Sequence, residues 1–452
     1  MTQASYIPAV ASCSYPARGG NLVRPMADGT EIFRRIGEVI EAAHHSVWLT
    51  IAFYVDDFRF PDGLGRLFDV LDRAVERGLD VRLLAWRSNP ETSHYGRQFG
   101  GSAEDRAMLR ERGSRVRIRW DRTATIYCQH QKCWMIDAGK PSETAFVGGV
   151  NLSADAIRRH DAYVEVNGPS ATDVHHNFVQ RWNEASERAE ADGSWACDVA
   201  DTLPFPLAVS GPRGTSTIQI QRMLHPGRYT DRHPAPGGNS FDVARGERSI
   251  LEQYKQAIDA ARRTIYLENQ AIPIPEIAGH LGRALERGVE VVLLVPAIPE
   301  PYVYEARLDR AQRARFDSIE ALGRHPNFQL AGIAETRNGK RHPIYVHCKL
   351  MMIDDVWTTI GSCNLHALSL GGHSELNVSI WDTAAVKALR VALYAKHLGV
   401  ETGALEDRAA LQLYARIARE NRARMKRGDP DWQGAALSLS PSAYAKTPGE
   451  VP

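Results

Sequence analysis

Hydrophobic positions recur along this chain in two long stretches that match each other. Between residues 31 and 49 the apolar side chains are spaced as on one face of a helix, and a short apolar strand follows. The same spacing returns between residues 249 and 267. A second matching pair, AVERGLDVRLL from Ala74 and ALERGVEVVLL from Ala284, predicts a helix, a glycine stop and a buried strand in each copy.

The order strand, helix, strand favours parallel strands covered by helices. Two copies of it predict an α/β protein built as two pseudo-symmetric α/β/α sandwich halves in one chain. Stretches rich in proline and glycine suggest where the halves begin and end. The expected parts are an N-terminal tail (1–20), a first half (21–205), a linker with the strand that opens the second half (206–245), a second half (246–400), and a C-terminal helix with a flexible tail (401–452).

Composition and charge narrow the class of protein. The chain has 55 Lys and Arg against 54 Asp and Glu, and a net charge of +1 excludes an obligate nucleic-acid coat protein. No apolar run approaches the roughly 18–20 residues that span a bilayer, and the N-terminus lacks the basic start of a signal peptide. We expect a protein that is cytoplasmic or peripheral to a membrane, with export without a cleavable signal left open. The six cysteines are expected to be free thiols.

Each half carries one copy of the motif His-x-Lys-x-x-x-x-Asp. The motif residues are His130, Lys132 and Asp137 in QHQKCWMID, and His347, Lys349 and Asp354 in VHCKLMMID. Residues two apart point to the same side of a strand, so the histidine and lysine of each copy should project toward one site. The aspartates lie five residues after their lysines, on the opposite face. All six are candidate catalytic residues, but for the aspartates we favour a structural role at the turn after the strand.

A turn of small residues with an asparagine follows each motif, and an acidic residue comes later. The asparagines are Asn151 in FVGGVNL and Asn364 in TIGSCNL, and their amides can donate to an anionic oxygen. Together with Lys132 and Lys349 they could stabilise the charge of a bound anion from four directions. No cluster of Asp and Glu suits Mg²⁺ or Ca²⁺, so we expect no metal and no cofactor.

The acidic residues are Asp161 in HDAYVEV and Glu375 in HSELNV. A carboxylate that accepts from one imidazole nitrogen makes the other nitrogen a better nucleophile. Following the order of the chain, we expect Asp161 to orient His130 and Glu375 to orient His347. Two further polar residues, Glu268 and Gln270, interrupt an otherwise buried strand and should reach the site or satisfy a buried network. The segment around Tyr302, expected to be a loop after a strand, could border the substrate site.

Taken together, the paired motifs and the GGVN and GSCN turns resemble the phospholipase D superfamily. The segments IYLENQ (265–270) and VHHNFVQRWNEA (174–185) are most similar to a bacterial phospholipase D of eukaryotic type. The resemblance covers roughly residues 20 to 400 and implies one active site at the interface of the halves. After GSCN the chain continues LHALSLGG, where eukaryotic-type members usually have an Asn and an Arg-Ser pair.

The resemblance also implies a mechanism and partners. His130 would attack phosphorus and form a phosphohistidine, and His347 would protonate the leaving alcohol and then activate water. The expected substrate is a phospholipid met by peripheral membrane contact, and the acceptor is water or an alcohol, so headgroup exchange should accompany hydrolysis to phosphatidic acid. We expect a monomer without obligate nucleic acid, because the duplicated chain holds both motifs.

Three alternatives remain at this point. A phosphatidyltransferase, similar to a cardiolipin or phosphatidylserine synthase, would use the same residues. A nuclease is less favoured, because family nucleases are often short chains with a single motif that dimerise. A catalytically dead interaction protein would be expected to have lost a motif histidine or lysine, and both motifs are complete here.

Overall fold

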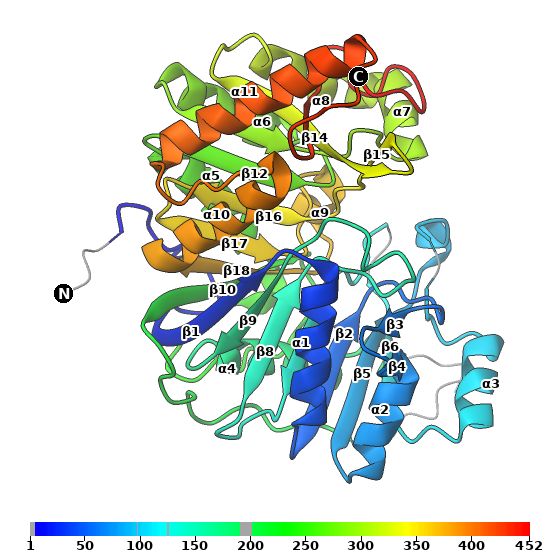
Figure 1. Cartoon of the computed structure of the whole chain (residues 1–452). Helices are drawn as coiled ribbons and strands as arrows, with labels where there is room; N and C mark the ends of the chain where they lie inside the picture. The colour runs from blue at the N-terminus through cyan, green and yellow to red at the C-terminus, as the bar shows by residue number, and fades with distance from the viewer. Residues whose placement is uncertain (1–4, 97, 124–125, 190–200) are drawn as a thin grey trace.

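Two mixed sheets, one in each half, form the frame of the protein (Figure 1). The computed structural model describes residues 5–96, 98–123, 126–189 and 201–452. The first sheet has, in order of neighbours, β1 (Arg18–Met26), β9 (Tyr163–Asn167), β8 (Thr144–Gly148), β7 (Cys133–Ile136), β2 (Ser46–Ile51), β5 (Asp80–Trp86) and β6 (Arg117–Asp121). Strands β2, β5 and β6 are parallel, and the remaining pairs are antiparallel.

The second sheet repeats this order. Its strands are β10 (Ser216–Leu224), β18 (Glu375–Trp381), β17 (Trp357–Gly361), β16 (Lys349–Ile353), β12 (Thr264–Asn269), β13 (Glu290–Leu294), β14 (Phe328–Arg337) and β19 (Ala436–Ser438). Short strands β3 (Arg59–Phe60), β4 (Gly65–Arg66), β11 (Glu247–Arg248) and β15 (Lys340–Pro343) lie in the connections. The parallel trio and the antiparallel run match strand for strand, so the predicted duplicated fold is observed.

Helices cover both faces of each sheet. The first half has α1 (Gly29–Glu41), α2 (Leu67–Glu76), α3 (Ala103–Arg112) and α4 (Ala171–Asn183). The second half has α5 (Ser249–Ala260), α6 (Pro275–Glu286), α7 (Pro301–Leu308), α8 (Arg313–Leu322), α9 (Ala367–Gly371), α10 (Thr383–Leu398) and α11 (Asp407–Lys426). Helices α1 and α2 share a core with one face of the first sheet, and α4 covers the other. In the second half α5, α6 and α8 lie opposite α10 and α11.

Strand β2 shows how the sequence pattern produces these layers. Val47 and Leu49 pack with α1 and α2, whereas Trp48 points to the other face and stacks on Phe178 of α4, with 5.1 Å between ring centroids. Alternate residues of a strand face opposite sides, so a strand buried on both faces carries apolar residues on both. Asp28 caps the N-terminus of helix α1, and its side chain accepts from two backbone amides of the first turn.

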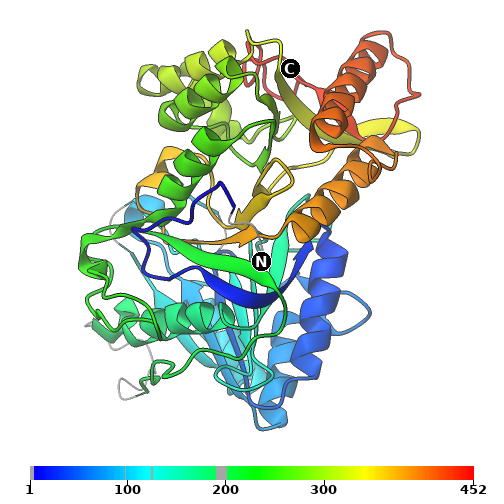
Figure 2. The same ribbon diagram turned by 90° about the vertical axis from the view of Figure 1, so that its left-hand side faces the viewer.

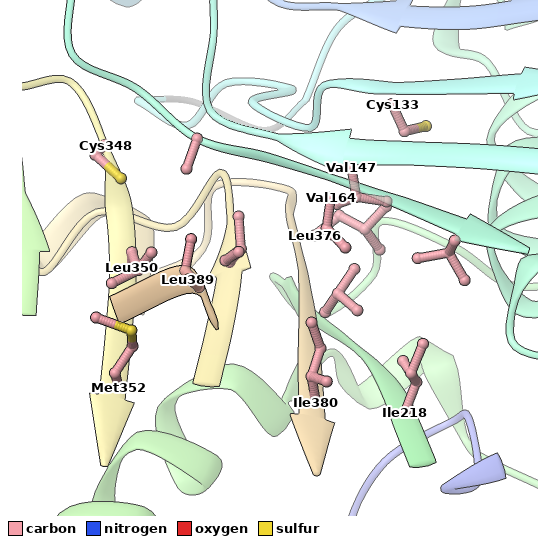
Figure 3. Close-up of a cluster of buried hydrophobic side chains, with 14 of the residues drawn as sticks. Cys133, Val147, Val164, Ile218, Cys348, Leu350, Met352, Leu376, Ile380 and Leu389 are labelled. Atoms are coloured by element: carbon pink, nitrogen blue, oxygen red, sulfur yellow. The ribbon is translucent and has the colours of Figure 1, made fainter. Parts of the chain in front are cut away.

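The two sheets meet along β1 and β10, which lie side by side between the halves (Figures 1 and 2). Arg18 pairs with Ile218 and Asn21 with Ser216 in antiparallel register. A single hydrophobic cluster continues across this junction and contains residues of both sheets (Figure 3). It includes Val147 and Val164 from the first half, and Ile218, Leu350, Leu376 and Ile380 from the second. The halves therefore share a core.

Both ends of the chain pack against the folded halves. Before β1, Ile7, Val10 and Tyr15 are buried, and the backbone N–H of Val10 donates to Gln219 at 3.1 Å. After α11, strand β19 pairs with β14, and Tyr444 is buried beyond it. The prediction of a flexible C-terminal tail was wrong, because a strand of three residues completes the second sheet despite its low-complexity surroundings. Among the described residues, no helix is long and apolar enough to cross a membrane.

Candidate active site

The two motif histidines lie at the junction of the halves and are anchored to each other's half. The backbone N–H of His130 donates to the carbonyl of Ser374 at 2.9 Å, and that of His347 donates to the carbonyl of His160 at 2.8 Å. Ser374 and His160 each immediately precede the acidic residue of their own half. Each motif is therefore held beside the acid of the opposite half.

As a result, each histidine is paired with the carboxylate of the other half. Nδ1 of His130 lies 2.9 and 3.0 Å from the two carboxylate oxygens of Glu375. Nδ1 of His347 lies 2.6 Å from Asp161. The expectation that Asp161 orients His130 and Glu375 orients His347 was wrong: the same four residues come together, but the pairs are crossed. In both pairs Nε2 is the ring nitrogen left for chemistry.

The two carboxylates are held differently. Glu375 also accepts from the hydroxyl groups of Ser362 at 2.5 Å and Ser369 at 2.6 Å. Asp161 accepts from its neighbouring backbone N–H at 2.8 Å, and its carboxylate lies against Gly149, where an added Cβ would come within 2.5 Å of it. Gly149 and Ser362 occupy the same place in the two turns. The glycine leaves room for the aspartate, and the serine supplies a hydrogen bond to the glutamate.

The two motif lysines are buried between these pairs. Nζ of Lys132 donates to the carbonyl of His130 at 2.8 Å, and Nζ of Lys349 donates to the carbonyl of His347 and, at 3.2 Å, to the side-chain oxygen of Gln270. Burial lowers the pKa of Lys132 to about 7 and that of Lys349 to about 8. Neither lysine forms an ion pair among the described residues, so an anionic ligand would supply the missing countercharge.

Protonation of the histidines is coupled to these lysines. Burial, together with the charges of both lysines, holds the pKa of His130 and of His347 well below the usual range. Burial also raises the pKa of Asp161 to about 6 and shifts that of Glu375 upward. A bound phosphate anion would offset the lysine charges and favour the protonated imidazole. Because both lysines act on both histidines, the four side chains belong to one site.

One of the two predicted asparagines, Asn151, has a contact with this site. The amide nitrogen of Asn151 is 3.5 Å from Nε2 of His347, the nitrogen that faces away from Asp161. Among the described residues, the side-chain oxygens of Asn151 and Asn364 are buried and accept no hydrogen bond. Both side-chain oxygens could therefore accept a hydrogen bond from a donor group of a ligand.

The motif aspartates are placed away from the histidines, as the strand geometry suggested. Asp137 accepts from the backbone amides of three successive residues, with a shortest distance of 2.7 Å at His45, and Asp354 does the same, with a shortest distance of 2.6 Å at Thr264. Both adopt a positive φ, 52° and 53°, at the turn after the strand. Both aspartates tie this turn to the start of the neighbouring strand. This contact favours a structural role for them over contact with the substrate.

A second buried polar network lies behind Asp161, and the sequence indicated only part of it. Nε2 of His160 lies 2.7 Å from Glu268, whose other oxygen accepts from Tyr266 at 2.6 Å. The hydroxyl of Tyr266 is in turn 3.2 Å from His397. Burial opposes ionisation of Glu268, but His160 outweighs it and holds the pKa at about 2. His160 was missed because HDAYVEV drew attention only to its aspartate.

Within the described residues, this network also holds the one group of three ligand-type side chains close enough for a metal ion. The candidate ligand atoms of His160, Glu268 and His397 lie within 4.8 Å of one another. The short His160–Glu268 contact and the Tyr266 hydroxyl already satisfy the carboxylate. We therefore interpret the group as a hydrogen-bond network that joins the segment before Asp161 to the second half.

The arrangement suits displacement at a phosphodiester. Two imidazoles with carboxylate partners face two buried ammonium groups, and these supply a nucleophile, a proton carrier and charge stabilisation. The sequence indicated all of these side chains and also Gln270, which contacts Lys349. Of the two serine partners of Glu375, Ser362 belongs to the GSCN turn that the sequence indicated, whereas Ser369, the single hydroxyl residue in LHALSLGG, was not indicated.

Comparison with known proteins gives matches that span both halves of the chain. The family described as "Cardiolipin synthase, PLD-like domain" matches residues 36–182 and 254–395, one segment in each half. Cardiolipin synthase 1 of Staphylococcus epidermidis is 26% identical over 386 residues, which cover 82% of this chain and 67% of that protein. Phospholipase D A of Dictyostelium discoideum is 26% identical over 456 residues, which cover 81% of this chain and 33% of that protein.

A solved structure shows the same fold. The phosphatidylserine synthase of Haemophilus influenzae superposes with a TM-score of 0.52 at 14% identity, covering 91% of this chain and 96% of that one. At this identity the likeness concerns the fold alone. The family match, in contrast, spans both halves and well over half of the chain. This protein therefore belongs to the phospholipase D superfamily, in the family described as "Cardiolipin synthase, PLD-like domain".

Proposed function

We propose that this protein is a phosphatidyltransferase of the cardiolipin synthase or phosphatidylserine synthase type, which moves a phosphatidyl group from one alcohol to another. The observation that carries the proposal is the crossed arrangement of His130 with Glu375 and His347 with Asp161 around two buried lysines. The description of the matching family and the name of Cardiolipin synthase 1 favour transfer over hydrolysis.

The first step uses both histidines. Nε2 of His130 attacks phosphorus, and the bond from phosphorus to the leaving alcohol breaks. Nε2 of His347 gives its proton to the leaving oxygen, and the carboxylate of Asp161 stabilises the imidazolium form of His347 that carries this proton before the transfer. Lys132 and Lys349 stabilise the negative charge on the phosphate oxygens. The product of this step is a phosphohistidine at His130 and a free alcohol. The choice of His130 as nucleophile follows the family resemblance.

The second step is the reverse with a new acceptor. Neutral His347 removes a proton from the acceptor hydroxyl, whose oxygen attacks phosphorus while the bond to His130 breaks. The acceptor is an alcohol in transfer and water in hydrolysis. Release of phosphatidic acid, which the sequence favoured as the main reaction, is thus the competing outcome of one intermediate. Neither step requires a metal ion. His347 donates the proton in the first step and accepts one in the second.

The experiment uses the purified protein in EDTA, with phospholipid vesicles and a primary alcohol in one reaction and single- and double-stranded DNA in another. We expect a phosphatidyl-alcohol, with phosphatidic acid as a minor product. Both should be lost in His130→Ala. His347→Ala should accumulate protein-bound labelled phosphate, because the intermediate forms slowly but is not released.

Two results would contradict the proposal. Cleaved DNA with intact lipid would assign the protein to the nucleases of the superfamily. Phosphatidic acid as the sole product at a high alcohol concentration would favour a hydrolase. Label trapped on His347 instead of His130 would reverse the roles of the two histidines and leave the reaction class unchanged.

A further inference from the structure

Asp161 belongs to the first half, but the residue before it, His160, is bonded to the second half. The backbone N–H of His160 donates to the carbonyl of Tyr345 at 3.0 Å, and its carbonyl accepts from the N–H of His347 at 2.8 Å. Nε2 of its side chain lies 2.7 Å from Glu268 of β12. His160 therefore contacts the second half through both its backbone and its side chain.

Glu268 has a fixed position relative to the motif of the second half. Strand β12 pairs with β16 in antiparallel register, and the residue after Glu268 lies opposite Lys349. His347 comes two residues before that lysine in the chain. A side chain of β12 therefore moves together with the strand that continues from His347. Through Glu268, His160 is attached to the same sheet that carries the imidazole partner of Asp161.

The contact between His160 and Glu268 is buried and involves a charged group. The two residues are 2% and 0% exposed. Burial alone would raise the pKa of the Glu268 carboxyl, but the imidazole of His160 holds this pKa at about 2, so the carboxylate stays charged. The hydroxyl of Tyr266 donates to its other oxygen at 2.6 Å and restricts its rotation. Hydrogen bonds to charged groups in such surroundings are short and strong, so this one can hold the backbone at residue 160 in place.

The other acid of the site is held in a different way. The residue before Glu375 is Ser374, whose buried hydroxyl has no partner among the described residues. The carboxylate of Glu375 accepts from two serine hydroxyl groups instead. Apart from its histidine partner, the carboxylate of Asp161 accepts, within the described part of the chain, only from the backbone N–H of the next residue. The position of Asp161 therefore depends on its backbone, which His160 attaches to the second half.

We propose that His160 and Glu268 are positioning residues for the reaction. Together they fix the distance between Asp161 and His347, and this distance controls how readily a proton reaches the leaving alcohol. The inference rests on the proposed function, in which His347 carries that proton. Loss of the contact would let the segment of Asp161 shift away from His347, so protonation would slow down while attack by His130 is retained.

The test compares two substrates that differ only in the alcohol. Vesicles contain phosphatidylpropanol or phosphatidyl-p-nitrophenol, ethanol is the acceptor, and the initial rate of alcohol release by the full-length protein is measured. Propanol must receive a proton as it leaves, whereas p-nitrophenol leaves as an anion. In Glu268→Gln the propanol rate should fall about tenfold and the p-nitrophenol rate by less than about twofold, so the ratio of the two rates falls.

Two further variants separate positioning from general damage. Glu143→Gln neutralises another buried His–Glu pair, in which Nδ1 of His175 lies 3.0 Å from Glu143, just before β8. This pair makes no contact with the site residues, so the ratio should stay as in the wild type. Tyr266→Phe removes only the hydroxyl that restrains Glu268 and should lower the ratio in the same direction as Glu268→Gln. Both rates come from one preparation, so the fraction of folded protein cancels in the ratio.

A double variant tests whether Glu268 acts through Asp161. In Asp161→Asn the carboxylate to be positioned is already lost. Adding Glu268→Gln to Asp161→Asn should therefore leave the ratio of the two rates as it is in Asp161→Asn alone. A ratio that falls by the product of the two single effects would show that Glu268 acts independently, and would overturn the positioning role.

The outcomes distinguish the positioning role from the underlying function. Unchanged ratios in both Glu268→Gln and Tyr266→Phe would overturn the positioning role while the proposed function stands. One divalent metal ion per chain in the purified protein, detected by mass spectrometry and lost in Glu268→Gln, would also overturn it, because the ion would replace the direct hydrogen bond. A wild type that releases neither alcohol would overturn the proposed function, and the positioning role with it.

Discussion

Each carboxylate of the site acts on the histidine of the other half, and this assigns the two acids to different steps. Asp161 contacts His347, the proposed proton carrier, whereas Glu375 contacts His130, the proposed nucleophile. Pairing by chain order would assign the acids the other way round. Kinetics with leaving groups of different acidity can therefore distinguish the crossed pairs from the pairs within a half.

Asp161→Asn should impair protonation of the leaving alcohol. We expect release of an alkyl alcohol to fall by about 10²-fold, while release of p-nitrophenol, which needs no proton, falls by less than about tenfold. Initial rates on two matched diesters provide the measurement. Glu375→Gln is the control, because weakening the nucleophile should slow both diesters to a similar extent. The opposite pattern in the two variants would contradict the crossed pairs.

The buried lysines predict how anion binding depends on pH. Lys132 and Lys349 have pKa values lowered to about 7 and about 8, so they lose their charge as the pH rises through this range. Sulfate stays dianionic throughout, and we expect its inhibition constant to rise at least tenfold between about pH 6.5 and about pH 9. In Lys132→Arg, which stays charged, this rise should be smaller and begin at higher pH. A flat profile in the wild type would show that the lysine charges do not bind the anion.

At the scale of elements, each motif aspartate holds the turn after its strand against the start of the neighbouring strand. Asp354 accepts from the backbone of three residues that lead into β12 and holds the turn after β16 against them. Asp354→Ala would leave these amides without a partner. We expect a loss of about 3 kcal/mol in the free energy of unfolding, measured in urea. Full stability combined with complete loss of turnover would instead indicate a chemical role.

The C-terminal segment should contribute to stability although its composition suggests a tail. Tyr444 is 1% exposed and packs in the core of the second half. Tyr444→Ala should reduce the free energy of unfolding by about 3–5 kcal/mol. Leu308→Ala, at a side chain that is 85% exposed, should change it by less than about 0.5 kcal/mol. Equal stability of the two variants would show that the segment after α11 is dispensable.

These elements also show what the sequence could predict. The spacing of apolar residues typical of helices and strands predicted the duplicated sheets, because the same spacing occurs in both halves of the chain. Strand β19 has three residues, which are too few to show the alternation of apolar and polar residues that predicts a strand. The segment around Tyr302 was expected to be a loop, but Pro301 begins helix α7 there. Proline fits the first turn of a helix, where its missing N–H is not needed, so the same residue is compatible with either structure.

At the scale of the whole molecule, the sequence could not predict how one half packs against the other. The spacing of the acids after their motifs is nearly the same in both halves, so chain order could not decide which histidine each would meet. That choice depends on the pairing of β1 with β10 and on the shared core between the sheets. These contacts join residues about 200 positions apart in the chain, and the pattern of neighbouring residues does not predict them.

A complete site within one chain has a simple consequence for mixtures of inactive variants. His130→Ala and His347→Ala each lack one imidazole of the same site, so mixing the two purified proteins should restore no more activity than the sum of the separate proteins. Transfer to an alcohol provides the measurement, and size-exclusion chromatography reports the oligomeric state. Recovered activity would show that the halves exchange between chains.

Crossed pairing also constrains how the two copies can change over time. Had each half kept its own acid and histidine together, one half could have drifted or been replaced as a unit. Here a substitution at Glu375 affects the imidazole of the first half, and one at Asp161 affects that of the second. Neither copy carries a catalytic pair that is its own. The duplication therefore produced two segments that must be inherited, folded and altered together.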